Sequence, residues 1–355
     1  MLQRPTLLLG IFVVMALSNA VVPVLPDFAV GAALQGAVYS AYFLGAFISV
    51  LPAGYASDRI GSVPLIRAGL FLTLASGILI LLSPSGLPLI IFRVIEGIGG
   101  GIFISATLAW TNSRPSAARE SGYVMAALNL GLVVGLLAAG WLDSAFGNHL
   151  AGIAVFTALA VPVTAMSVTV REGERAGFVR ADITGIVRNY FWLFTAVLVL
   201  VGLTGAVAAI YPGYTGNDST VLALQLATIN IATVVAVLVK PRFKFRPIPA
   251  IRASALLMAP AVAAAYVTPY AFPIIGALSG VTIVAVLAFL AETGIQQGVM
   301  TGLFNTASYA GFTLLSALAG VFAVWFGFLT TFLLLAVIVA AVAIPIGRCR
   351  CEYRG

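Results

Sequence analysis

The sequence GYASDRIGSVPLIR, residues 54–67, is a short charged turn between two long apolar runs. Asp58 and Arg59 are the only charged residues between Asp27 and Arg67. An unpaired charge inside hydrocarbon costs at least about 2.5 kcal/mol, so this turn must lie outside the core of a membrane. Gly54 and Gly61 flank the two charges and let backbones approach closely there, because glycine has no Cβ.

The whole chain has the composition of a membrane protein. Of its 355 residues, 61% are hydrophobic and 8% are charged, whereas a soluble domain carries about 25% charged residues. His149 is the only histidine, which excludes a multi-histidine metal site. The chain shows no aspartate-rich diphosphate motif and no serine–histidine–acid constellation in clear view. We therefore expect no enzyme, no cofactor and no metal.

A helix needs about 20 apolar residues to span the hydrocarbon. By that rule the sequence predicts twelve spans and an all-α membrane protein. The spans cover roughly residues 6–26, 31–54, 63–83, 87–111, 121–141, 150–170, 190–212, 219–239, 249–267, 270–291, 296–323 and 328–347. A cleaved signal peptide is an alternative for the first span, because Arg4 precedes it and Ser18-Asn19-Ala20 resembles a cleavage site. The apolar run continues through Leu25, however, which favours a span.

The distribution of charge supports an even number of spans. Arg67 and Arg252 fall in the first turn of their spans, where a long side chain can reach the interface, and we count them with the adjoining connections. All but one of the 18 cations then belong to the even-numbered connections or the termini. The odd-numbered connections carry only Asp27, Asp143, His149 and Asp218. By the positive-inside rule, both termini are cytoplasmic, and we expect a multi-pass protein of the cell membrane.

The chain divides into two related halves. The longest non-apolar stretch, residues 171–189, predicts a cytoplasmic linker between a bundle at 1–170 and a bundle with a short tail at 190–355. A shift of 180 residues pairs Gly131 with Gly311 and Gly140 with Gly320, and it also pairs Phe146-Gly147 with Phe326-Gly327. We expect these glycines to allow close helix packing in each half.

Three motifs resemble those of one transporter family. The pattern G-x-x-x-D-R-x-G at residues 54–61 resembles the signature loop of the major facilitator superfamily, although Ser62, Val63 and Pro64 replace its further basic residues. R-x-x-E-G at residues 93–97 is similar to the family's R-x-x-Q-G. Gly131, Gly135 and Gly140 match most of a glycine pattern like the family's antiporter motif, in which Leu136 here replaces a proline. The glycines could also serve tight packing alone.

The resemblance implies the major facilitator fold. In that fold two pseudo-symmetric six-helix bundles alternate access to a site near the membrane midplane.

The fourth span contains the only charges predicted deep within the hydrocarbon, Arg93 and Glu96. Their i,i+3 spacing places them on one helix face, where they can pair. Intramembrane charges usually mark a pathway, so we expect Glu96 to carry a proton and Arg93 to set its affinity for that proton. The alternative is a structural pair that neutralises itself.

The turn at 54–61 predicts a conformational latch made by Gly54, Asp58, Arg59 and Gly61. Asp58 is expected near the N-terminus of a neighbouring helix, where an anion is favoured by roughly 0.3–1 kcal/mol. Arg59 is expected to pair across the cytoplasmic face. The alternative is that both are solvated loop charges.

Scattered polar side chains predict the lining of a largely apolar solute cavity, although each could instead make an interhelical hydrogen bond. They are Asn19, Gln35, Tyr39, Asn129, Tyr211, Gln225, Asn230, Asn305 and Tyr309.

The resemblance to the superfamily, in the manner of its drug-efflux members, implies a proton-coupled exporter of small lipophilic or weakly polar solutes. Uptake or facilitated diffusion of a small metabolite is the first alternative, and a non-transporting sensor or embedded enzyme is the second. We expect a monomer whose partners are the solute, protons and the bilayer, with no nucleic acid. Cys349 and Cys351 form either a reduced tail of no function or half of a metal site.

Overall fold

The computed structural model describes residues 3–112, 117–172, 183–239, 246–291 and 297–347. Cys349, Cys351 and most of the predicted linker lie outside these ranges. The described chain is helical and contains 12 helices long and apolar enough to cross a membrane. This confirms the predicted fold class and the count of spans. Helices suit such a chain because a backbone in hydrocarbon must satisfy its hydrogen bonds internally.

The described chain forms two compact units. Unit 1 comprises Met1–Val30, Val38–Val179 and Gly216–Leu224, and unit 2 comprises Gly31–Ala37, Arg180–Thr215 and Gln225–Gly355. The predicted boundaries at 170 and 190 stay predictions.

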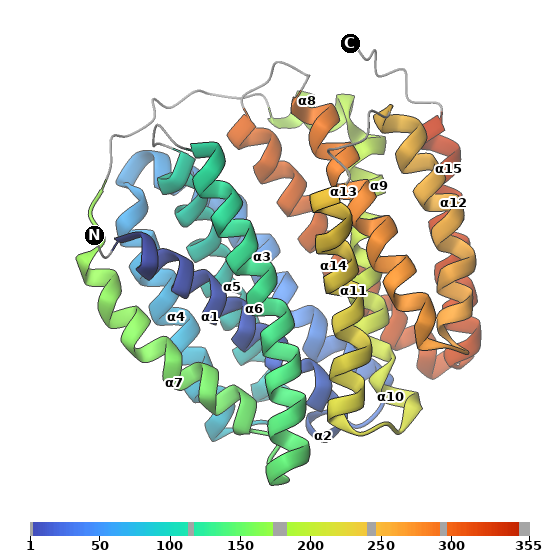
Figure 1. The fold of residues 1–355 in the computed structure, drawn as a ribbon, viewed down its shortest axis with the longest axis horizontal. Helices are drawn as coiled ribbons and strands as arrows, with labels where there is room; N and C mark the ends of the chain where they lie inside the picture. The colour runs from blue at the N-terminus through green and yellow to red at the C-terminus, as the bar shows by residue number, and fades with distance from the viewer. Residues whose placement is uncertain (1–2, 113–116, 173–182, 240–245, 292–296, 348–355) are drawn as a thin grey trace. The chain divides into compact units, whose positions relative to one another are not determined.

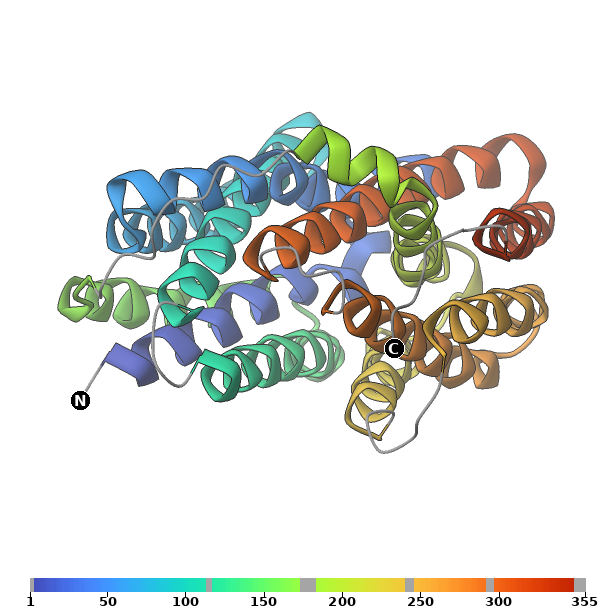
Figure 2. The same cartoon turned by 90° about the horizontal axis from the view of Figure 1, so that it is seen from above.

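Unit 1 is built mainly from the helices of the first half. Their bounds are α1 Gln3–Ala20, η1 Val22–Val24, α2 Leu25–Phe28, α3 Ala32–Ile60, α4 Ser62–Leu82, α5 Gly86–Asn112, α6 Ala117–Phe146, α7 Ala151–Met166 and η2 Ser167–Thr169. Helix α1 packs against α6 and α7, and α4 packs against α5 and α7 (Figure 1 and Figure 2). Leu7, Ile11, Leu70 and Phe103 lie in the apolar core between these helices. Arg4 pairs with Glu120 where α1 and α6 begin.

Unit 2 is built mainly from the helices of the second half. Their bounds are α8 Ile183–Asn189, α9 Phe191–Ile210, α10 Pro212–Thr215, α11 Ser219–Val239, α12 Pro247–Ala265, η4 Pro269–Ala271, α13 Phe272–Ala291, α14 Gln297–Phe326 and α15 Phe328–Gly347. Helix α9 packs against α14, and α12 packs against α13 and α15.

The two halves repeat one helix arrangement. Helices α6 and α14 each have 30 residues, and their bounds differ by the shift of 180 residues found in the sequence. Both helices end in a phenylalanine that is followed by a glycine, Gly147 at φ 62° and Gly327 at φ 78°, a conformation that favours glycine. Helix α6 packs on α1, the first span, and α14 packs on α9, the seventh. The equivalent pairs therefore pack in the same way.

Candidate functional site

The fourth span, α5, carries a buried ion pair in unit 1. Arg93 is 1% exposed and Glu96 is 0% exposed. Nη1 of Arg93 donates to Oε2 of Glu96 at 2.6 Å, across the i,i+3 spacing of the helix. Nη2 of Arg93 donates to the carbonyl of Ser18 on α1 at 3.1 Å. The guanidinium therefore joins α5 to α1 as well as to Glu96.

An aromatic group covers the guanidinium. The Cζ atom of Arg93 lies 5.0 Å from the ring centroid of Tyr42 on α3, within reach of a cation–π interaction. Phe43 contacts both Tyr42 and Tyr39, each with ring centroids 5.1 Å apart. The sequence predicted Tyr39 as a residue of the solute cavity and did not single out Tyr42, which follows it at i,i+3 and so shares its helix face.

The glycines of α5 allow this arrangement. A Cβ added to Gly97 would collide with the carbonyl oxygen of Tyr42, and one added to Gly101 would collide with Ser49, also on α3. A Cβ on Gly99 would lie 2.8 Å from the backbone nitrogen of Thr73 on α4. The run GIGGG thus brings α5 against two helices and places Arg93 beside Tyr42.

Part of the buried pair has no hydrogen-bonding partner. Among the described residues, Oε1 of Glu96 and Nε of Arg93 are buried and make no hydrogen bond. A buried polar atom without a partner is costly, and such atoms call for an explanation. Oε1 of Glu96 is a place where a proton, or a donor group of a solute, could bind.

The other predicted cavity residues are divided between the units. In unit 1, Nδ2 of Asn19 donates to the carbonyl of Leu132 on α6 at 3.0 Å, and Asn129 donates to Met125 of its own helix at 2.8 Å. Those two amides therefore make interhelical and intrahelical hydrogen bonds.

In unit 2, buried Tyr211 packs edge-on against Tyr214 and Phe272. A Cβ on Gly213 would lie 2.5 Å from Oε1 of Gln35, which is also buried. The remaining predicted side chains are half-buried: Gln225, Asn230, Asn305 and Tyr309.

The signature turn lies at the junction of α3 and α4. Asp58 and Arg59 are exposed in the last turn of α3, and the Arg59 guanidinium lies 4.3 Å from the ring centroid of Tyr55. Gly61 has φ 98°, which permits the reversal between the two helices. Gly54 lies within α3, where a Cβ would approach Ser105 at 3.3 Å.

The carboxylate at the N-terminus of α4 belongs to a residue that the sequence did not single out. Oε1 of Glu172 accepts from the Ser62 amide at 2.9 Å, and Oε2 accepts from the Val63 amide at 3.0 Å. A Cβ on Gly61 would lie 2.6 Å from Oε2. Arg67 donates to the carbonyls of Val168 and Val170 nearby. The start of the predicted linker is thus fastened to the signature turn.

The predicted packing glycines all lie against backbone. Cβ atoms on Gly131 and Gly135 would collide with carbonyls of α1, and one on Gly311 would collide with a carbonyl of α9. A Cβ on Gly140 would lie 2.5 Å from the carbonyl oxygen of Ser219, and one on Gly320 would lie 2.6 Å from that of Ala32.

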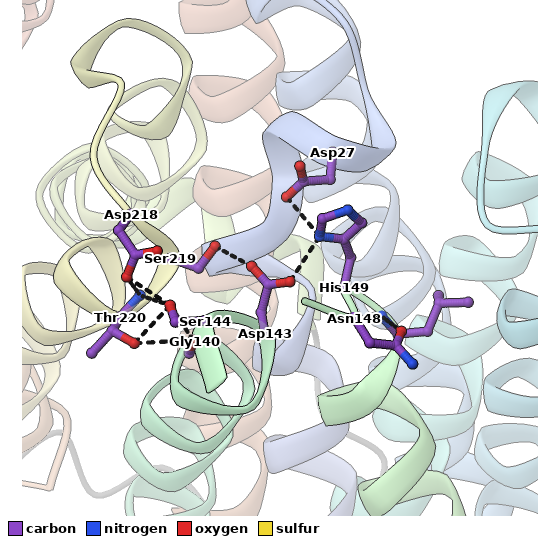
Figure 3. Close-up of polar contacts among 10 residues, drawn as sticks. Asp27, Gly140, Asp143, Ser144, Asn148, His149, Asp218, Ser219 and Thr220 are labelled. Carbon is purple, nitrogen blue, oxygen red and sulfur yellow. Dashed lines mark hydrogen bonds and ion pairs between the residues drawn. The ribbon is translucent and has the colours of Figure 1, made fainter. Parts of the chain in front are cut away.

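A second polar cluster in unit 1 joins residues that the sequence identified only as loop charges (Figure 3). Nδ1 of His149 hydrogen-bonds Oδ1 of Asp143 at 2.8 Å and lies 3.5 Å from Oδ2 of Asp27. Ser219 donates to Oδ2 of Asp143 at 2.5 Å. Ser144 donates to Asp218 at 2.6 Å, and this bond, with those from the Thr220 and Ser219 amides, lowers the pKa of the exposed Asp218 carboxyl.

Known proteins resemble this chain in sequence. A model of the Major Facilitator Superfamily matches residues 7–314. A probable anion transporter 6, chloroplastic, of Arabidopsis thaliana is 34% identical over 127 residues, which are 35% of this chain and 25% of that protein. A multidrug resistance protein B homolog of Mycobacterium tuberculosis is 34% identical over 126 residues, which are 34% of this chain and 23% of that protein. The matches thus span about a quarter of the length of these curated relatives.

Solved structures resemble it over almost the full length. A bacterial homolog of the human lysosomal transporter Spinster, inward-facing and unoccupied, gives a TM-score of 0.75 at 17% identity and covers 99% of this chain and 98% of its own. The nucleoside transporter NupG gives 0.76 at 12% identity, covering 98% and 100%. The xylose transporter XylE from E. coli gives 0.71 at 14% identity, covering 100% and 98%. At these identities the likeness shows the fold alone.

Proposed function

Because this chain belongs to the Major Facilitator Superfamily, we propose that it exports small lipophilic or weakly polar solutes in exchange for protons. It is a secondary transporter of that family, not an enzyme, and a multi-pass membrane protein with 12 spans. The exported solute, the direction of transport and the coupling to protons are the parts that we propose.

The buried pair on α5 carries the proposal of proton coupling. Glu96 is a fully buried acid within a membrane span, and one of its oxygens is bonded to Arg93 while the other has no donor among the described residues. A proton that binds the carboxylate removes its negative charge and weakens its bond to Arg93. The charge of Glu96 and the strength of its bond to Arg93 therefore change when the transporter takes up or releases this proton.

The surroundings of Arg93 make such a change tolerable. Removing one partner of a buried ion pair costs roughly 3–5 kcal/mol when the remaining charge is uncompensated. Here the guanidinium keeps the Ser18 carbonyl and the face of Tyr42 when Glu96 becomes neutral. We infer that these contacts hold Arg93 in place while the proton is carried.

The proposed class of solute and direction rest on composition and on one relative. The predicted cavity residues are all asparagines, glutamines and tyrosines and carry no charge, which favours a lipophilic or weakly polar solute. The likeness to a multidrug resistance protein B homolog supports export, over the part of the chain that it covers. We further propose that the protein acts as a monomer in the cell membrane with both termini cytoplasmic.

The test compares Glu96→Gln with the wild type in liposomes. The substitution keeps the size of the side chain but cannot take up or release a proton. With an imposed pH gradient, we expect the variant to lose solute accumulation, while exchange of labelled for unlabelled solute without a gradient continues. Accumulation is measured with a panel of lipophilic cations and neutral dyes, and proton flux is measured with an internal pH indicator.

Glu120→Gln is the matched control. Glu120 is also a buried acid paired with an arginine, but its partner is Arg4, near the start of α1. We expect this variant to accumulate solute as the wild type does. Undiminished proton-driven accumulation by Glu96→Gln would exclude the proposed coupling. Accumulation only in the opposite direction would favour uptake of a metabolite instead.

A further inference from the structure

Three side chains that could bind a metal converge in unit 1, away from the buried pair. Asp27 lies on α2, Asp143 lies near the end of α6, and His149 lies between α6 and α7 (Figure 3). One ligand atom from each, Nδ1 of the imidazole and one oxygen of each carboxylate, lies within 4.8 Å of the other two. The convergence therefore requires the fold, because its members come from separate segments.

The charges of this cluster are unbalanced. Two carboxylates face a single imidazole, which can carry at most one positive charge. None of the odd-numbered connections contains Lys or Arg, and the neighbouring Asp218 adds another acid. Like charges held this close repel one another unless a cation lies between them. Among the residues that the structure describes, His149 is the only basic side chain paired with these two carboxylates, so a cation from solution would complete the cluster.

We propose that Asp27, Asp143 and His149 bind a divalent transition-metal ion of the Zn²⁺ class. Zinc bonds to imidazole nitrogen and carboxylate oxygen are about 2.0–2.2 Å long, so two ligand atoms of a tetrahedral site lie about 3.3 Å apart. The observed separations from Nδ1, 2.8 Å to Asp143 and 3.5 Å to Asp27, lie on either side of that value. Imidazole selects Zn²⁺, Ni²⁺ or Cu²⁺ over Mg²⁺ and Ca²⁺, which prefer oxygen ligands.

The arrangement also has features beyond the three ligands. Ser219 donates to the second oxygen of Asp143, and such outer contacts orient the ligands of metal sites. Asp27 and His149 are exposed, which gives an ion access from solution and leaves a coordination position for water. A bound ion would fasten α2 to the end of α6 and, through Asp143, to the first residue of α11.

The experiment titrates the purified full-length protein, freed of metal by a chelator, with Zn²⁺ alone in a calorimeter. We expect one saturable Zn²⁺ per chain and a higher thermal unfolding midpoint in its presence, with no response to Mg²⁺. Asp27→Asn and His149→Asn should each weaken binding by about tenfold or more, since even loss of an outer-shell partner costs about 10–100-fold. Both substitutions lie at exposed side chains, and size-exclusion chromatography confirms that the variants fold.

Asp218→Asn is the matched control, because it removes one negative charge from the same face but no proposed ligand. We expect it to bind Zn²⁺ as the wild type does. If Asp218→Asn weakened Zn²⁺ binding as much as Asp27→Asn does, Zn²⁺ would be attracted to the acidic residues in general. That result would overturn the proposed site. Absence of saturable binding to the wild type would overturn it as well. Neither outcome depends on whether the protein exports solute or couples to protons.

Discussion

At the scale of single residues, some charged side chains of this protein are buried in pairs and others are exposed. Arg93 and Glu96 are buried and depend on one another, whereas Asp58 and Arg59 are exposed. A buried pair stabilises little by itself, because desolvation offsets the Coulomb attraction. Stability alone is therefore a weak reason for such a pair within a membrane span, and we propose that it serves transport.

Asp218 provides a prediction of pH dependence at this scale. The Ser144 hydroxyl, followed by the amides of Thr220 and Ser219, lowers the pKa of its carboxyl below the ordinary value of 3.8. A depressed pKa contributes stability above the ordinary value, and this contribution is lost as the pH falls through the folded value. Ser144→Ala should raise the pKa of Asp218 toward 3.8. The measurement is a carbon NMR titration of labelled aspartate carboxyls.

The control for that titration removes a similar hydroxyl elsewhere. Ser167 donates only to the Thr164 carbonyl of its own segment, so Ser167→Ala should leave the titration of Asp218 unchanged. Asp218→Asn identifies the resonance by its loss. An unchanged pKa in Ser144→Ala would mean that the backbone amides alone set it.

At the scale of helices, the glycines of α5 decide how closely α3 and α4 each pack against α5. Gly97→Ala should destabilise the protein by about 1–3 kcal/mol, the usual cost of overpacking, because the new Cβ meets the Tyr42 carbonyl rather than a flexible side chain. The same substitution should also move Tyr42 away from Arg93 and reduce transport. Thermal unfolding in detergent measures the first effect, and the liposome assay measures the second.

Gly122→Ala on α6 is the matched helical control. A Cβ at Gly122 meets nothing within 4 Å, and alanine has the higher helix propensity by about 1 kcal/mol. We expect the unfolding midpoint of this variant to stay the same or rise. If Gly97→Ala behaved in the same way, the close approach of α3 and α5 would be irrelevant to the site.

The N-terminus of α4 is bound by a carboxylate from a distant part of the chain, not by the one that the local motif offers. The sequence predicted an anion at a helix N-terminus and assigned this role to Asp58. At the N-terminus of α4 the anion is Glu172, which comes from the far end of the six-span half. Asp58 is exposed in the last turn of α3, and the latch that the sequence predicted there stays a prediction. No local pattern could have identified Glu172, because the contact forms only when η2 returns to the start of α4.

At the scale of the whole molecule, the sequence predicts what depends on local composition and misses what depends on folding. The twelve spans follow from the length of apolar runs, and Arg93 and Glu96 follow from their spacing on one helix. Tyr42 was missed because an aromatic residue in a span usually belongs to apolar packing. Asp27, Asp143 and His149 were recognised only as loop charges, because their convergence joins segments more than a hundred residues apart.

The distribution of charge also predicts which side of the membrane each connection between the spans faces. If the cations mark the cytoplasmic side, Asn148 is exposed outside the cell and Arg246 is exposed inside. Single cysteines are introduced at these positions after Cys349 and Cys351 are replaced by serine. The two cysteines should then differ in how a membrane-impermeant reagent labels them in intact cells. A membrane-impermeant maleimide should label Asn148→Cys at once and Arg246→Cys only after the cells are permeabilised. The reverse pattern would place the proposed Zn²⁺ site on the cytoplasmic side and would contradict the positive-inside argument that places both termini in the cytoplasm.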